Sequence, residues 1–551
     1  MSKIKRNIIG LLFGLSLICI CLSMVGGFSL ITSDADAVAK FAMSDGAAIR
    51  LLGSDDDYAG VRWETTVNKT FYDSLTINEG DQIEFGVVVA PKKKIVADNA
   101  PLTDKTTSVK IIPCTREVEY DENNEFVYYS SIVFNKEWDA AKLNAAYGVE
   151  LTARAYVKIN GEYTFTDEYD TTRSMRAVAL ESLNHGFTQE EVGGYFGLIS
   201  EDTTMSGYYD AQESTAVLEN VNQLNVGTYA ASVNAQPVEV NVNSDSTVTL
   251  TGNVKGLAAG NDYKLNVFDT DNNVYIQKFK CVTLIIREAS DLEIFHVKKA
   301  WNDKFTESEI FDGYYLLGND IDCAGYIYGG VDANGVQNQN VISAWSSSNQ
   351  FNGYGLTGTF DGNGHTIKNL TTSGAGLFFA ISGGTVKDLN LRGNIAKNKS
   401  GDNSGFFAGY LFDATVSNVN IDCTRSGRWA QMPLANRIIN SSLSNIVVTV
   451  NGNTSGGGDG IVSYLKNTNA ENTNVFTDCY VVSDKTIANS NANNRYDAKY
   501  VNGVAVEGGL DGIKRYTTAD EFLADKDNND YSSFNADVWD TSSGMPLWKN
   551  N

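Results

Sequence analysis

The stretch Asp361-Gly362-Asn363-Gly364-His365 places a carboxylate, an amide and one of only three histidines within five residues. Such a loop could contact a cation or a sugar. However, D-G and N-G are also turn dipeptides, because glycine and asparagine tolerate the backbone angles of tight turns. We therefore predict a turn between GLTGTF and TIKNL, with His365 starting the next strand, and keep a ligand contact as the less favoured alternative.

Four other carboxylates could serve a carbohydrate-active enzyme: Asp388, Asp413, Asp422 and Asp478. Glycoside hydrolysis needs two carboxylates about 5–10 Å apart across one cleft. A lyase would need an acidic calcium cluster below a basic residue, and the available arginines are dispersed: Arg392, Arg425, Arg428 and Arg437. The first and last carboxylates also occupy a repeated position that a structural role explains. We expect no catalytic residues, and a polysaccharide lyase or glycosidase is the alternative.

Metal chemistry has little support. The run Asp269-Thr-Asp271-Asn-Asn273 copies the start of a calcium loop, but Val274 and Lys280 stand where an EF-hand needs Gly and Glu, so we predict a hairpin turn. Five widely spaced cysteines follow the N-terminal segment without CxxC spacing, and we interpret them as single buried thiols. We expect no cofactor and no metal site, and at most weak Ca²⁺ attraction to the acidic surface.

Aromatic residues make a better case for binding, since sugars stack on exposed aromatic faces. Five lie in the C-terminal half, and we predict them as ligand-binding residues: Trp345, Tyr354, Tyr410, Trp429 and Tyr464. The alternative is that most of them fill the interior or the ends of the fold. Trp539 and Trp548 are expected to belong to a terminal cap.

Five segments of the C-terminal half repeat one pattern. Each has an apolar residue, one intervening residue, Asn or Asp, and then apolar or small residues one and three places further on: TIKNLTT (366–372), TVKDLNL (385–391), TVSNVNI (415–421), SLSNIVV (442–448) and VFTDCYV (475–481). The spacings of 19, 30, 27 and 33 residues indicate a solenoid. The alternation is that of a strand, and Asn or Asp suits a sharp left-handed bend and a hydrogen-bonded ladder from coil to coil. A parallel β-helix follows.

A second echo precedes several of these segments: GLFFAI (376–381), GFFAGYL (405–411) and GIVSYL (460–465). Their aliphatic and aromatic residues are expected to fill the coil. By the same alternation Leu389 points inward, with Leu370 and Val419 as neighbours, and Lys387 points outward and should tolerate Asp.

The fold class is mainly β, with N-terminal β-sandwich-like domains followed by a short right-handed parallel β-helix. Residues 45–181 alternate short β runs with turns, including Asn160-Gly161 between two alternating runs, and predict a β-sandwich-like domain. Residues 212–287 predict a small Ig-like domain, and 290–551 the β-helix with a terminal cap.

The N-terminus supplies an address. Lys3, Lys5 and Arg6 precede an apolar run and a small-x-small site at Ala35–Ala37, so we predict a secretory signal over 1–37, with an uncut membrane anchor as the alternative. A net charge of −24 argues against binding of nucleic acid and against adsorption to anionic lipid. We therefore expect contact with a membrane only through the N-terminal segment, and only if that segment is uncut. We expect an extracellular or cell-surface protein.

GTFDGNGHTIKNLTT followed by GLFFAISGGTVKDLNL resembles the GLUG repeat of bacterial surface proteins and of the stalks of IgA-specific metallopeptidases. LLGNDIDCAG and VWDTSSGMPLWK resemble the flanks of such repeats. FGVVVAP and ARAYVKING resemble an uncharacterised domain of exported proteins from Gram-positive bacteria. The resemblance implies a β-helix on an exported protein. It does not carry over the peptidase, because His185, His296 and His365 start no HExxH. The expected role is non-catalytic adhesion, or binding of a glycan or host-surface ligand; a structural spacer is a further alternative.

Overall fold

The computed structural model describes residues 41–549, except 45, 51–59, 99, 115–119, 123, 135–136, 167–171, 296–311, 327–354, 373–375, 396–403, 426–430, 453–461, 467–473, 484–499, 502–503 and 506–511. The predicted signal over 1–37 therefore lies outside the described residues. Within them, no helix combines the length and apolar character needed to cross a membrane. The chain forms two compact units, residues 1–172 and 173–551, each considered by itself below.

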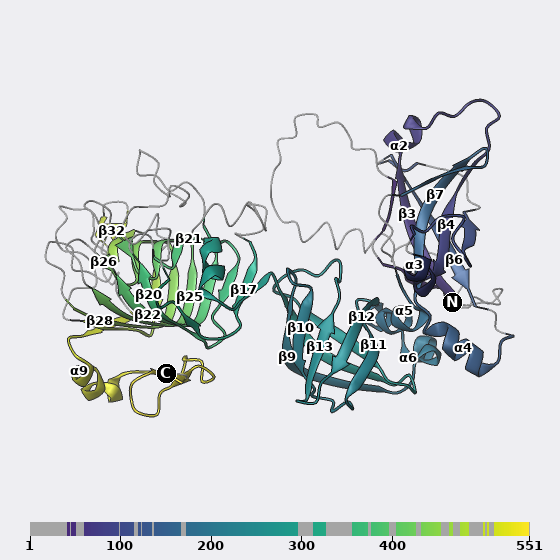
Figure 1. Cartoon of the computed structure of the whole chain (residues 1–551). Helices are drawn as coiled ribbons and strands as arrows, with labels where there is room; N and C mark the ends of the chain where they lie inside the picture. Colours follow the sequence, from purple (N-terminus) through teal and green to yellow (C-terminus); the bar gives the residue numbers. More distant parts are fainter. Residues whose placement is uncertain are drawn as a thin grey trace, which may run out of the picture. The chain divides into compact units, whose positions relative to one another are not determined.

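The first unit contains two antiparallel sheets (Figure 1). One sheet is built from β1 (Phe41–Met43), β2 (Ala48–Arg50), β3 (Gly60–Asn68) and β6 (Glu125–Val133), the other from β4 (Ile83–Pro91), β5 (Lys110–Pro113), β7 (Leu151–Ile159) and β8 (Glu162–Phe165). Buried apolar side chains from both sheets form one cluster that includes Val67, Phe85, Tyr128 and Val157. The Tyr128 hydroxyl also donates to the Gly86 carbonyl at 3.0 Å across the core.

Turn chemistry in this unit follows its sequence. Asn160 and Gly161 join β7 to β8 with φ values of 50° and 94°, as predicted for a tight hairpin.

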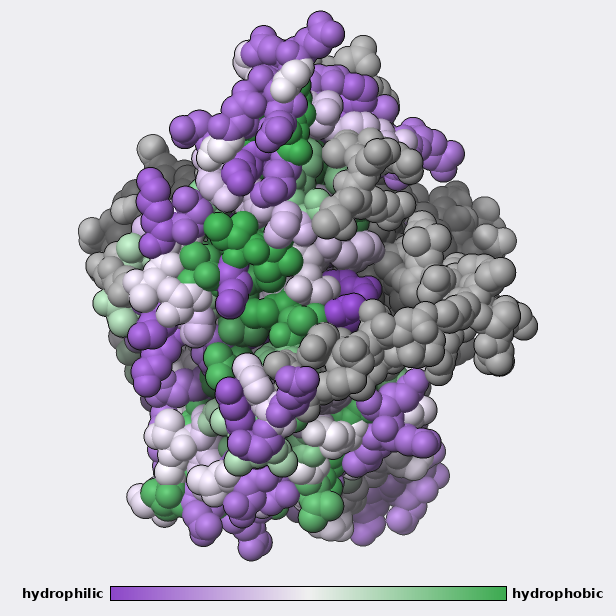
Figure 2. All heavy atoms as spheres, turned by 90° about the vertical axis from the view of Figure 1, so that its right-hand side faces the viewer, coloured by the Kyte–Doolittle hydropathy of each residue, from purple (hydrophilic) through white to green (hydrophobic). Residues whose placement is uncertain are grey.

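Some apolar side chains of the unit stay exposed: Val96, Ile111, Tyr129, Val133 and Val149. Figure 2 shows apolar side chains gathered in one area of the face that it presents, with hydrophilic ones around them.

The second unit opens with α5 (Met175–Ser182) and α6 (Gln189–Val192) and continues into a closed β-barrel. The barrel contains β9 (Ile199–Asp210), β10 (Thr215–Glu219), β11 (Gly227–Val233), β12 (Gln236–Val242), β13 (Thr247–Thr251), β14 (Asp262–Phe268) and β15 (Val274–Val282). The Ig-like prediction for 212–287 is corrected here, because β9 pairs with both β10 and β15 and closes the sheet. The polar sequence of β9 concealed this strand.

The β14–β15 connection is the predicted hairpin turn. The Asp269 carboxylate Oδ1 accepts the backbone N–H groups of Asp271 and Asn273 at 2.8 and 2.9 Å. Backbone bonds between Asp269 and Asn273 close the turn.

A parallel β-helix of about four turns follows the barrel, and the predicted mainly β fold class is confirmed (Figure 1). The path of its main sheet is β16 (Leu284–Ile286), β17 (Tyr314–Leu317), β19 (Thr359–Asp361), β22 (Thr385–Ile395), β25 (Thr415–Arg425), β28 (Ser442–Asn451), β31 (Cys479–Val482) and β34 (Ile513–Tyr516). The shorter strands β18 (Ile321–Asp322), β20 (Thr366–Thr372) and β30 (Val475–Thr477) join it at the side. A second parallel sheet stacks β21 (Phe378–Ser382), β24 (Ala408–Phe412), β27 (Ala435–Ile439) and β29 (Val462–Lys466).

The coil interior is a set of apolar columns that run from coil to coil. Leu389 is fully buried, pairs in register with Val419, and is followed on the next coil by Ile446. The free thiols of Cys423 and Cys479 lie in the same core, and burial raises the pKa of each to about 12. The predicted inward face and the buried-thiol interpretation of these two cysteines are thus confirmed.

The first repeat is aligned differently from the sequence prediction. Phe360, and not Ile367, pairs with Val386, while Ile367 pairs with Leu391 and Leu370 with Gly393. The TFD segment is therefore the counterpart of TVK. The turn at 362–365 replaces the single bent residue of later coils, which explains the short first spacing of 19 residues.

The bends themselves behave as predicted. Five Asn or Asp residues have positive φ between 50° and 56°: Asn369, Asp388, Asn418, Asn445 and Asp478. Asn and Asp adopt this left-handed conformation more readily than other side chains that carry a Cβ. The GNGH turn is also confirmed, since Asn363 and Gly364 have φ of 51° and 76° and His365 N donates to Gly362 O at 2.8 Å.

The C-terminal segment returns beside the main sheet (Figure 1). After β34 come α9 (Ala519–Ala524), β35 (Trp539–Asp540) and β36 (Leu547–Trp548). Its buried aromatic side chains pack on residues of β28, β31 and β34: the cluster contains Val447, Tyr480, Val482, Tyr516, Phe522, Phe534, Val538, Trp539 and Trp548. The Trp548 indole N–H reaches the first repeat and donates to Gly364 O at 2.9 Å. We call residues 517–549 the C-terminal cap.

Leu389→Asp should destabilise the second unit severely, since an unpaired carboxylate in this column costs several kcal/mol against a total of about 5–15 kcal/mol. Thr424→Asp, at an exposed position of β25, is the matched control and should cost less than about 0.5 kcal/mol. Thermal unfolding of the full chain measures both. Equal melting temperatures would contradict the inward register.

Trp548→Ala should lower the stability of the second unit by about 3–5 kcal/mol, because it removes a buried ring and the donor to Gly364 O. Leu547→Ala changes the adjacent residue, which is 40% exposed, and should have a small effect. Denaturant midpoints of the two variants give the comparison. A Trp548→Ala midpoint equal to wild type would show that the cap contributes nothing to the coils.

Candidate functional site

The left-handed Asn and Asp residues form a ladder whose side chains are held from outside by the cap. The Asn445 amide donates to Asn418 Oδ1 at 3.1 Å. The Ser533 hydroxyl lies 2.7 Å both from Asn445 Oδ1 and from Asp478 Oδ2. The carboxylate of Asp478 is therefore bound to a structural partner in the cap.

Asn535, two residues after Ser533, extends these cap contacts toward the first coils. The Asn535 backbone N–H donates to Asn418 Oδ1 at 3.3 Å, and its side-chain amide donates to Asp388 Oδ1 at 3.1 Å. Together Ser533 and Asn535 contact four successive coils. Asn369, the remaining left-handed residue, lies on β20 instead and donates to Asp322 Oδ1 at 2.8 Å.

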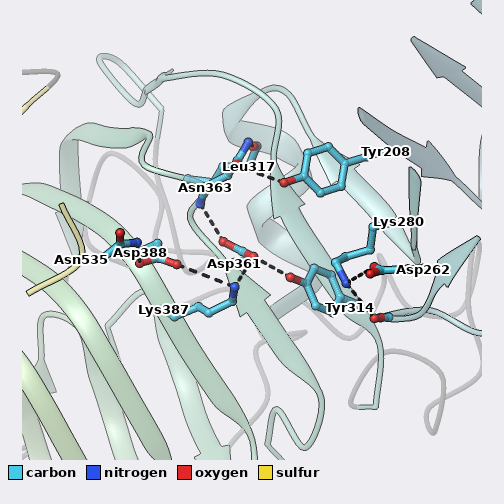
Figure 3. A network of polar contacts seen from close by, with 11 residues as sticks. Tyr208, Asp262, Lys280, Tyr314, Leu317, Asp361, Asn363, Lys387, Asp388 and Asn535 are labelled. Carbon is cyan, nitrogen blue, oxygen red and sulfur yellow. Dashed lines mark hydrogen bonds and ion pairs between the residues drawn. The ribbon is translucent and has the colours of Figure 1, made fainter. Parts of the chain in front are cut away.

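Beside the ladder lies a buried ionic centre at Asp361, the last residue of β19 (Figure 3). Asp361 is 5% exposed. Its Oδ1 accepts the Asn363 backbone N–H at 2.9 Å. Its Oδ2 accepts the Tyr314 hydroxyl at 2.5 Å and lies 2.7 Å from Lys387 Nζ. The turn thus presents its carboxylate to three donors from three different segments.

Lys387 lies between two carboxylates, because Asp388 Oδ2 is 3.7 Å from the same Nζ. Burial disfavours the charged ammonium, but the carboxylates of Asp361 and Asp388 outweigh it and raise the pKa of Lys387. Burial raises the pKa of Asp388, and the neighbouring Asp361 charge adds to this, while the Asn535 amide and Lys387 oppose it. The centre therefore holds the Lys387 ammonium close to the carboxyl groups of Asp361 and Asp388.

The barrel contributes the opposite wall of this centre. The Tyr208 hydroxyl donates to Asn363 Oδ1 at 3.3 Å. Lys280 lies with its Nζ 5.7 Å from the centre of the Tyr314 ring and 2.6 Å from Asp262 Oδ1 (Figure 3). Burial raises the pKa of Tyr314, and the Asp361 carboxylate raises it further, so this hydroxyl stays protonated and donates.

A second buried carboxylate fixes the barrel to the β-helix. Asp210 is fully buried, and its Oδ2 accepts the Ile285 backbone N–H at 2.9 Å and Arg287 Nη1 at 3.3 Å. Its Oδ1 accepts the N–H groups of Gln212 and Glu213, both at 3.0 Å. The junction is therefore hydrogen-bonded on both sides.

The sequence-derived catalytic candidates fall into separate structural places. Asp388 and Asp478 belong to the ladder, Asp413 occupies a left-handed turn with φ of 48°, and Asp422 lies 3.5 Å from Arg392. Among the residues that the structure describes, no group of three His, Cys, Asp or Glu side chains could hold a metal ion.

The five predicted ligand residues are placed only in part. Trp345, Tyr354 and Trp429 lie outside the described residues, and for Tyr464 the backbone alone is described. Tyr410 is 6% exposed. The register of the second sheet puts Tyr410, Arg437 and Tyr464 on one row, and the Arg437 guanidinium lies 5.6 Å from the Tyr410 ring centre.

Two features escaped the sequence prediction. Lys387 does point away from the apolar core, but it is the cation of Asp361, so the expectation that Lys387→Asp costs little is wrong. Tyr314 belongs to no motif that would mark it as a partner of Asp361. The available signal was the acidic residue at the turn together with Lys387 beside the ladder residue Asp388, and it became visible only once β19 was paired with β22.

Comparisons with known proteins give little beyond this. No family model matches the chain, and no curated protein matches it. One solved structure with similarity is described as "Biofilm associated protein - BSP domain"; it is 12% identical, the match covers 45% of this chain and 53% of that chain, and the TM-score is 0.13. The match thus spans about half the length of that domain.

Lys387→Ala should destabilise the second unit by about 1–3 kcal/mol, because it leaves the buried Asp361 carboxylate without its Lys387 partner. The control is Lys368→Ala, whose ion pair with Asp322 is 3.7 Å long and about half exposed, and which should cost under about 1 kcal/mol. Chemical denaturation of both variants measures the difference. The ionic centre would have no structural weight if the two losses were the same.

Proposed function

We propose that this chain is an exported surface protein of the GLUG-repeat type, whose β-helix binds an extracellular ligand, a glycan or a host- or bacterial-surface molecule, without turning it over. The proposal combines the basic, apolar and small-residue order of segment 1–37 with the scaffold of the second unit. The biological role that follows is adhesion. The supporting observation is the row formed by Tyr410, Arg437 and Tyr464.

The row supports binding because of what its members offer. Tyr410 is nearly buried, so its ring supports the Arg437 guanidinium and leaves little face for a sugar. Arg437 is half-buried and carries a planar guanidinium, a group whose geometry suits sugar hydroxyls and carboxylates. Parallel stacking brings successive members of such a row about 4.8 Å apart, close enough for one ligand to touch several coils.

A non-catalytic role is favoured over the carbohydrate-active alternative by the engagement of the described acids. Asp388 and Asp478 accept hydrogen bonds from the cap, and Asp422 faces Arg392. A general acid and a nucleophile need an open cleft and room for a sugar between them. The ionic centre at Asp361 is closed by Tyr314, Asn363 and Lys387.

The test is a glycan array probed with the full secreted chain. Arg437→Ala should reduce binding at least about tenfold, corresponding to the loss of a charge-assisted contact of roughly 1.5–3 kcal/mol. Arg392→Ala is the matched control, since Arg392 lies on the main sheet and pairs with Asp422. Both variants should keep the wild-type melting temperature within a few degrees.

Three outcomes separate the alternatives. Binding that Arg437→Ala removes and Arg392→Ala keeps supports the proposal. Release of reducing ends or unsaturated sugars from the bound glycan would establish the enzyme instead. Silence on glycan arrays and on cell-surface extracts would leave a structural spacer.

A further inference from the structure

In the ionic centre a potential nucleophile, the Lys387 amine, lies against a potential electrophile, the Asp361 carboxyl group, and both residues belong to paired strands. Asp361 and Lys387 are register partners on the adjacent parallel strands β19 and β22. Their side chains lie on the same face, and Nζ is 2.7 Å from Asp361 Oδ2. Because both backbones are held in the sheet, the amine and the carboxyl group stay close to each other.

We propose that Lys387 and Asp361 condense into an intramolecular isopeptide bond, with Asp388 as the acid–base residue. The reacting groups are the ε-amine and the side-chain carboxyl, and the product is a secondary amide that joins two successive coils. The third group is in place, since Asp388 Oδ2 lies 3.7 Å from the same Nζ.

The atoms balance without any co-reactant. Asp388 takes a proton from the Lys387 ammonium, and the neutral amine then attacks Cγ of Asp361, forming the N–C bond. The C–Oδ2 bond breaks, and the departing oxygen leaves as water with one proton returned by Asp388 and one lost by the nitrogen. An ammonium and a carboxylate thus become an amide and one water, with no change in net charge.

The Asp361 carboxyl group is already held as an acyl-transfer centre requires. The Asn363 backbone N–H donates to Oδ1 at 2.9 Å, which is the oxygen that keeps the developing negative charge. The Tyr314 hydroxyl donates at 2.5 Å to Oδ2, which is the departing oxygen. One fixed donor therefore stabilises the intermediate and another assists departure.

Two physical terms favour the reaction in this place. Positioned groups react with effective molarities of about 10⁵–10⁸ M, which lowers the barrier to condensation. Condensation also removes two charges from a site where Asp361 is 5% exposed and where burying charge is costly. The raised pKa of Asp388 is consistent with a carboxyl group that exchanges a proton near the amine.

The test is mass spectrometry of the full chain, purified and denatured, with trypsin mapping. Sequence predicts tryptic fragments 305–368 and 388–392 when Lys387 is free. The bond would block cleavage after Lys387 and join fragments 305–368 and 369–392, and the intact mass would fall by one water. We expect most wild-type molecules to carry this link.

Two variants separate the bond from the ion pair. Lys387→Arg keeps the cation beside Asp361 but replaces the amine by a guanidinium that does not lose its proton, so the link and the water loss should disappear. Asp388→Asn keeps both reacting groups and should lower the linked fraction at least about tenfold at matched times. Either variant that failed to fold would leave the other, and the wild-type map, to decide.

Full wild-type mass with complete cleavage after Lys387, unchanged on prolonged incubation, would overturn the proposal and reduce the centre to an ion pair. Linked wild type with an equally linked Asp388→Asn variant would overturn the assignment of Asp388.

Discussion

The structure of the second unit depends on the bend inside each coil. The strand must turn sharply at one residue. That residue must adopt positive φ and still carry a side chain, which glycine lacks. Asp388, Asn418, Asn445 and Asp478 meet this condition, but each then carries a polar side chain at the edge of an apolar core. The ladder and the cap supply their partners, so the backbone constraint and the polar requirement are satisfied by the same contacts.

This arrangement changes the mechanics expected of a solenoid. In a simple solenoid each coil contacts only its neighbours, and the ends can open independently. Here Ser533 and Asn535 touch four coils, and Trp548 reaches the turn of the first repeat. At the other end Asp210 and Tyr208 fix the barrel to the first coils. The barrel, the coils and the cap should therefore unfold together.

Much of the architecture was legible in the sequence because local rules decide it. The alternation of TVKDLNL and TVSNVNI fixed the inward columns, and the Asn and Asp bends were correctly predicted. The failures have one cause, which is long-range pairing. The polar strand β9 gave no periodic signal, and the pairing of Phe360 with Val386 was hidden by the closer likeness of TIKNL to TVKDL.

The candidate site was less legible for the same reason. The interpretation of Asp361 as part of a turn holds. Its partners are distant in the sequence, because Tyr314 precedes Asp361 by 47 residues and Lys387 follows it by 26. Tyr410 was selected as an aromatic, whereas its row became meaningful only with Arg437 beside it. Composition can suggest which residues bind, but only the stacking of coils places them together.

Hydrogen–deuterium exchange of the full chain tests the central claim, that the cap makes the coils one cooperative unit. The account predicts that the backbone amides of β22, β25, β28 and the cap segment 534–539 exchange with one common free energy, close to that of global unfolding. Early exchange of 534–539 while β22 and β25 stay protected would contradict it, because the coils would then be stable without the cap.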